Sequence, residues 1–141
     1  MSPSFNAAAR EREEGTDARS GRAVTIGLVG WFVPGAAHAL LGQTAKGALF
    51  FVVLTGMFAI GLAFGGRLFP FQFAEWLVFL AALAQWGVGL PRLIAGMTGL
   101  GAGDVIAVTY EYGNTFLMAA GLLNALVLLD AVDVAKGRKP R

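Results

Sequence analysis

Residues 30–47 read GWFVPGAAHALLGQTAKG and join two apolar runs. The first run is interrupted at Pro34-Gly35, and the single histidine, His38, follows one helical turn later. Because proline lacks a backbone N–H and glycine adds flexibility, the pattern predicts a kink at this point. A glycine-flanked turn then leads into the second run. This arrangement is typical of a membrane hairpin whose first helix is interrupted at one position.

The composition indicates an integral membrane protein of one domain. Of 141 residues, 56% are hydrophobic and only 14% are charged, whereas soluble domains average about 25% charged residues. The absence of cysteine excludes disulfides, thiolate metal sites and cysteine nucleophiles. One histidine cannot form a multi-histidine metal site, and we expect no metal and no cofactor. The 20 glycines are typical of closely packed membrane helices.

The chain begins with a polar arm, residues 1–22, in which four arginines are matched by four acids. Its low apolar content predicts a disordered arm, and the balanced charge argues against nucleic-acid binding. Residues 23–41 follow without a charge and would span about 28 Å as a helix, close to the hydrocarbon thickness. Arginines before an apolar run also resemble a signal peptide, but the half-acidic charge of the arm argues against one.

Three further apolar segments are expected to cross the membrane. The predicted fold is all-α, an integral membrane bundle of four transmembrane helices arranged as two hairpins. A glycine-rich stretch with strand-like composition is predicted as a long outer loop. The expected parts are a first hairpin 23–66 with helices 23–41 and 47–66, a second hairpin 67–134 with helices 73–90 and 115–134, the outer loop 91–114, and a basic tail 135–141.

Lysine and arginine positions predict the orientation, because cytoplasmic segments carry an excess of them. Four crossings place the arm, the tail and Arg67 on one side, with nine Lys and Arg residues. Only Lys46 and Arg92 lie on the other side. We therefore expect a multi-pass protein of the cell inner membrane with both termini in the cytoplasm.

Five polar residues are the candidate functional positions, since polar groups in a bilayer are costly and are functional candidates by default. They are His38, Gln85, Glu111, Asn124 and Asp130. His38 is predicted to bond Gln85, Glu111 or a carbonyl freed by Pro34. Asn124 is predicted to hold helices together, for example through Thr55, and Asp130 to pair with Lys136 or Arg67. Structural and proton-linked roles both remain open for His38.

Two blocks carry a resemblance to known families. Trp31-x-x-Pro34-Gly35-x-x-His38-x-x-x-Gly42 followed by Lys46-Gly47 resembles the opening hairpin of the two-transmembrane-helix domain family. With the C-terminal block, which includes Thr109–Phe116 and Leu129–Lys139, it resembles small bacterial four-helix membrane proteins of unknown function over residues 24–139. The resemblance implies no activity and no catalytic residue.

No catalytic motif stands out in the chain, so the expected function is non-enzymatic. We expect a scaffold or accessory subunit that packs in a homo-oligomer or a larger membrane complex, with the lipid bilayer as its surroundings. The alternative is a small proton- or ion-coupled transport component that uses His38, Glu111 and Asp130.

Overall fold

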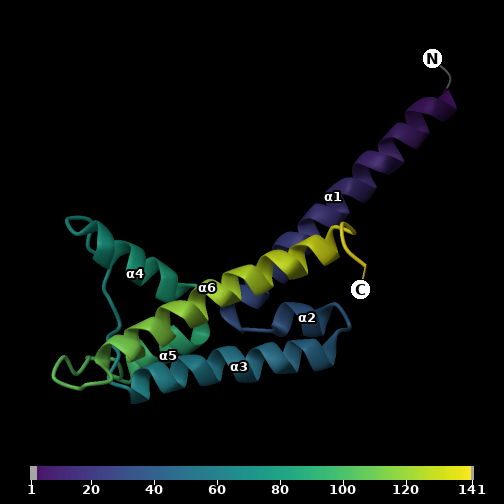
Figure 1. Cartoon of the computed structure of the whole chain (residues 1–141). Coiled ribbons are helices and arrows are strands. Elements are labelled where there is room, and N and C mark those ends of the chain that lie inside the picture. The colour runs from purple at the N-terminus through teal and green to yellow at the C-terminus, as the bar shows by residue number, and fades with distance from the viewer. Residues whose placement is uncertain (1–2, 141) are drawn as a thin grey trace.

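The computed structural model describes residues 3–140 and is helical, without a named strand in that range (Figure 1). Residues 1–2 and 141, the outermost parts of the predicted arm and tail, lie outside the described residues. The helices are α1 (Pro3–Phe32), α2 (Ala36–Leu40), α3 (Thr44–Ala63), α4 (Trp76–Trp86), α5 (Leu90–Met97) and α6 (Tyr110–Ala135).

Two long apolar helices, α3 and α6, form the centre of the molecule and run in opposite directions (Figure 1). Both are long and apolar enough to cross a membrane. Glycines allow them to approach closely: a Cβ at Gly61 would meet Leu117 at 2.8 Å and the Gly113 carbonyl oxygen at 2.9 Å. The prediction that small residues mediate helix packing is confirmed here.

The first apolar segment does not cross as one helix. α1 ends at Phe32, and after Pro34 the chain turns at Gly35, whose φ of +80° suits glycine. α2 then runs back beside α6, where Ala37 and Leu41 share a core cluster with Ala131 and Val134. The predicted kink at Pro34-Gly35 is therefore a reversal, and both ends of segment 23–41 lie near the C-terminal end of α6.

The predicted third helix is also broken. α4 and α5 meet at an angle of 111°, with Gly89 at a φ of +68° between them. α4 packs on α6, while α5 returns beside α3, where Ala95 shares a core cluster with Phe58 and Leu117. Among the described residues there are two candidate membrane-spanning helices, or three if the bent pair is one span. The predicted count of four is not found.

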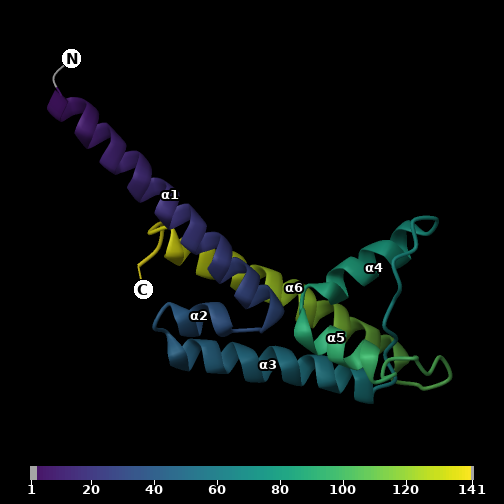
Figure 2. The ribbon, with the colours of Figure 1, turned by 180° about the vertical axis from the view of Figure 1, so that it is seen from behind.

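The two broken segments enter from opposite ends of the bundle and meet at its middle (Figure 2). The Trp31 indole N–H donates to the Trp86 carbonyl oxygen at 2.9 Å, which joins the end of α1 to the end of α4. A Cβ at Gly89 would collide with the Trp31 carbonyl oxygen, so this position requires glycine. Each broken segment is followed by a long helix, α3 or α6, and these helices are antiparallel. Each half of the chain is thus a broken segment followed by a long helix, but the packing differs, because α1 and α4 both pack on α6.

The segments outside the bundle differ from the prediction as well. Residues 3–22, predicted as a disordered arm, continue α1 as an exposed helix that projects beyond the bundle (Figure 1). The predicted outer loop contains α5 and the start of α6, which leaves residues 98–109 as the connection. This connection pairs with the one after α3: Leu68 N–H donates to Gly101 at 2.8 Å, and Asp104 N–H to Gly65 at 2.9 Å. Both connections lie at the end of the bundle opposite the termini.

Candidate functional site

Asp130 is the centre of an ionic group near the C-terminal end of α6, which we call the terminal cluster. Its Oδ2 lies 3.0 Å from His38 Nε2 and accepts a hydrogen bond from Lys46 Nζ at 2.7 Å. Its Oδ1 accepts from Lys139 Nζ at 2.7 Å. The reversal at Pro34 makes this possible, because it brings α2 and the start of α3 beside the end of α6. The predicted pairing of Asp130 with Lys136 or Arg67 was wrong.

His38 is completely buried within the terminal cluster. Its Nε2 contacts a carboxylate, which only accepts hydrogen bonds, so this nitrogen carries the proton. The Phe50 ring packs edge-on against the imidazole, with centroids 5.1 Å apart, and Nδ1 is buried without a hydrogen-bond partner among residues 3–140. The predicted bonds to Gln85, Glu111 or a freed carbonyl were wrong.

Lys139 lies beyond the end of α6, in the exposed tail. Its hydrogen bond to Asp130 and the attraction between the two charges raise the pKa of Lys139 above its ordinary value. This ion pair connects the exposed tail to α6. Since the tail and α2 bind the same carboxylate, the terminal cluster joins segments from both ends of the chain.

Asn124 lies near the middle of α6 and forms what we call the central junction. Its Nδ2 donates to the carbonyl oxygens of Gly87 at 2.9 Å and Gly30 at 3.2 Å, and it lies 3.5 Å from that of Trp31. These carbonyls belong to the broken ends of α1 and α4, where helical hydrogen bonds are lost. The predicted role of Asn124 in holding helices together is confirmed, but its partners are broken helix ends rather than Thr55.

Gln85 does not bond His38. It bonds the backbone of the connection that follows α3. Its Nε2 donates to the Arg67 carbonyl at 2.8 Å, and its Oε1 accepts from Phe69 N–H at 2.9 Å. Arg92 bonds the Phe69 carbonyl at 2.8 Å, and Asn114 accepts from Arg67 N–H at 2.8 Å. We call these four side-chain contacts the loop anchor. It provides hydrogen-bond partners for backbone groups of Arg67 and Phe69, which lie outside the helices.

Glu111 lies in the first turn of α6 and takes part in neither the terminal cluster nor the central junction. It is 19 residues from Asp130 along one helix, a separation of about 28 Å. The predicted meeting of His38, Gln85 and Glu111 is therefore not formed: His38 lies at the end of the bundle near the termini, while Gln85 and Glu111 lie toward the other end.

Sequence reasoning missed the contributions of Lys46, Arg92, Asn114 and Lys139. A signal was present for one of them, since Lys46 is the only charged residue between Arg22 and Arg67. A single cation between apolar runs often pairs with an acid elsewhere, and the unpaired acid in the apolar part of α6 is Asp130. Among residues 3–140, no group of three or more His, Asp or Glu side chains is arranged to hold a metal ion.

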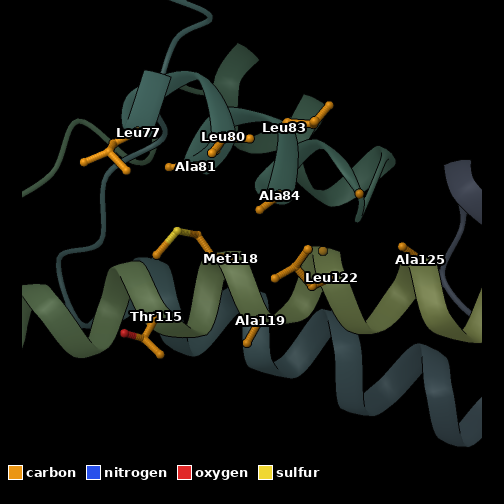
Figure 3. Close-up of a pocket in the computed structure, with 12 residues that line it drawn as sticks. Leu77, Leu80, Ala81, Leu83, Ala84, Thr115, Met118, Ala119, Leu122 and Ala125 are labelled. Atoms are coloured by element: carbon orange, nitrogen blue, oxygen red, sulfur yellow. The ribbon is translucent and has the colours of Figure 1, made fainter. Parts of the chain in front are cut away.

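A groove of about 760 Å³ runs between α4 and α6, and we call it the α4/α6 groove (Figure 3). Figure 3 shows Ala84 of α4 pointing toward α6 and Met118 of α6 pointing toward α4. The groove is almost wholly apolar. Its labelled lining includes Leu77, Leu80, Ala84, Met118, Leu122 and Ala125.

Long apolar helices with polar contacts at broken helix ends are features of helical membrane proteins, and two or three helices here could span a membrane. The chain belongs to the family of unknown function DUF6677, whose model matches residues 25–140. The match includes both broken segments and excludes most of the exposed part of α1. No curated protein and no solved structure matches the chain.

Proposed function

We propose that the chain is a non-enzymatic integral membrane protein that acts as a scaffold or accessory subunit in a homo-oligomer or a larger membrane complex. The buried polar side chains support this role, because Asn124, Gln85 and Asn114 bond the backbone of their own chain. These groups hold the fold together. A partner would then be recognised by the outer surfaces of the helices.

The observation that favours a partner most directly is the α4/α6 groove. α4 leans away from α6, so apolar side chains such as Leu80 and Leu122, each more than half exposed, have no covering element in the described chain (Figure 3). Alanine and glycine positions on both walls would allow a partner helix to approach closely. A second copy of this chain is the first candidate for that helix.

We expect that Leu122→Trp, which fills the α4/α6 groove, will reduce association about tenfold, because a helix could no longer enter it. The measurement is the mass of the purified protein in mild detergent, together with the proteins recovered with it. Ile60→Trp on the outer side of α3 is the control and should leave association unchanged. A wild-type protein that is monomeric and recovers no partner would contradict the proposal.

Orientation forms part of the proposal. Of the ten Lys and Arg residues in the described chain, eight lie at the end that holds the termini. Only Arg67 and Arg92 lie toward the other end. Compared with the sequence prediction, Lys46 and Arg67 have exchanged sides, so the imbalance is kept. We place a multi-pass chain in a bacterial inner membrane with both termini in the cytoplasm.

We also propose that the chain is of bacterial origin and is related to the two-transmembrane-helix domain family. Residues 30–47 supply the Pro-Gly break and the glycine turn on which that relation rests. The reversal of the first arm sets this hairpin apart from one with two complete crossings.

A proton- or ion-coupled transport component is the second candidate. Broken helices that meet at the membrane centre, in repeats of opposite direction, are a feature of many transporters. The buried His38 and the partly exposed Asp130 form an acid–base pair that a proton could reach. Glu111, the third residue of this candidate, lies too far away to join them, so a pathway would have to follow the length of α6.

His38→Gln separates the structural role of the pair from the transport role. Glutamine keeps one hydrogen bond to Asp130, so we expect the melting temperature to fall by only a few degrees. Transport would require the imidazole to change charge between about pH 5 and 8. Under the leading proposal, proton flux into liposomes is at background for both wild type and variant. Wild-type flux that the variant loses would favour transport.

A further inference from the structure

A second groove lies between α1 and α6, with a volume of about 540 Å³. We call it the α1/α6 groove. It runs from the middle of the bundle to the end that holds the termini. Its walls include Ala23, Gly27 and Trp31 from α1, and Leu128, Val132 and Lys136 along α6.

The length of the α1/α6 groove matches one leaflet of a bilayer. Its α6 wall extends from Ala125 to Lys136, 11 residues or about 16 Å of helix. Half of a hydrocarbon core of about 30 Å is about 15 Å. The inner end lies beside Trp31, which bonds the α4 end at the centre of the bundle. The other end therefore opens where lipid headgroups lie.

The charge at this opening favours an anion. Lys136 lines the groove, is exposed, and forms no ion pair within residues 3–140. Its neighbours are occupied, since Lys139 pairs with Asp130 and Arg138 with Asp133. Arg22 directly precedes Ala23 at the same end. The α4/α6 groove has no Lys or Arg in its lining, so only one of the two grooves combines apolar walls with a cation.

We propose that the α1/α6 groove binds an anionic phospholipid of the leaflet at the terminal end, with an acyl chain along the groove and the phosphate at Lys136. The apolar walls suit the acyl chain, and the unpaired cation supplies headgroup selection. Basic pockets between membrane helices recognise acidic headgroups in this way. The lipid would lie against Val24 and Leu28 of α1, which line the groove and are each 63% exposed.

Trp31 reports on the groove, since its side chain lines the inner end. In Trp76→Phe/Trp86→Phe protein it is the only tryptophan, and circular dichroism would check that the fold is kept. The protein is placed in vesicles of equal parts phosphatidylglycerol and phosphatidylcholine. In one preparation phosphatidylglycerol carries bromine atoms near its acyl-chain ends, and in the other phosphatidylcholine carries them. Bromine quenches tryptophan fluorescence.

We expect phosphatidylglycerol to occupy the groove about fivefold more than phosphatidylcholine, as one cation near a membrane surface contributes about 1 kcal/mol. Lys136→Gln should remove this excess. Arg138→Gln removes a charge from the same tail outside the groove and should keep it. Equal quenching by both lipids, or equal loss in the two variants, would overturn the proposal. Absence of quenching by either lipid would do so too, since a protein helix would then fill the groove.

Discussion

A cysteine at Thr44 will react with a membrane-impermeant maleimide only from the side that holds both termini, and a cysteine at Gln72 only from the other side. The natural chain has no cysteine, so single substitutions give unambiguous labelling. In intact cells we expect Gln72→Cys to be labelled. Thr44→Cys and Ser20→Cys should be unlabelled in intact cells and fully labelled after the membrane is permeabilised.

The physical reason is the reversal at Pro34-Gly35. If residues 23–41 crossed as one helix, Thr44 would lie opposite the arm and Gln72 beside it. Lys46 and Lys139 instead both bond Asp130, which holds the start of α3 beside the tail. Labelling of Thr44→Cys from outside, with Ser20→Cys protected, would refute the fold. If Thr44→Cys and Ser20→Cys were labelled in intact cells and Gln72→Cys were protected, only the orientation would be refuted.

Asn124→Leu will lower the free energy of unfolding by about 3 kcal/mol. The carbonyl oxygens of Gly30 and Gly87 would lose their donor in a buried site, where each unsatisfied group costs about 1–3 kcal/mol. The loss exceeds that expected for one ordinary interhelical hydrogen bond, about 0.6–1.7 kcal/mol, because one amide serves both broken helices. Reversible unfolding in mixed detergent measures the difference.

Two variants control for this result. Leu126→Ala, on the outward side of the same helix, removes a large side chain without touching the central junction and should change stability by less than about 1 kcal/mol. Asn124→Asp keeps the shape but loses the amide donor, so it should be at least as harmful as leucine. A leucine variant as stable as wild type would show that the central junction contributes nothing.

The sequence predicts the two long helices well, since each is predominantly apolar over about the 20 residues that a spanning helix needs. It also identifies Pro34-Gly35 as a break. It does not give the angle at that break, because proline and glycine permit a small kink and a complete reversal alike. The packing of Ala37 and Leu41 against α6 selects the reversal, and contacts so distant in sequence leave no local pattern.

The contacts of the candidate functional residues could likewise be predicted only in part from the sequence. Asn124 could be assigned a role in packing, because an amide at the centre of an apolar helix requires partners. The partners were not predictable: they are backbone carbonyls 37 and 94 residues away, exposed only because two other helices are broken. For His38, the wrong end of the bundle was assigned once segment 23–41 was read as a crossing, and Gln85 and Glu111 then became its expected neighbours.

The reversal at Pro34 also determines how the two halves of the chain are related, through the parity of their membrane crossings. In the proposed topology, residues 23–63 enter, return and then cross once through α3, and residues 76–135 do the same through α6. A unit with an odd number of crossings leaves the chain on the far side, so an identical unit that follows must insert upside down. Had the first arm crossed completely, each unit would contain two crossings, and tandem copies would face the same way. A single Pro-Gly step therefore allows head-to-tail duplication of one unit to produce an antiparallel pair within one polypeptide.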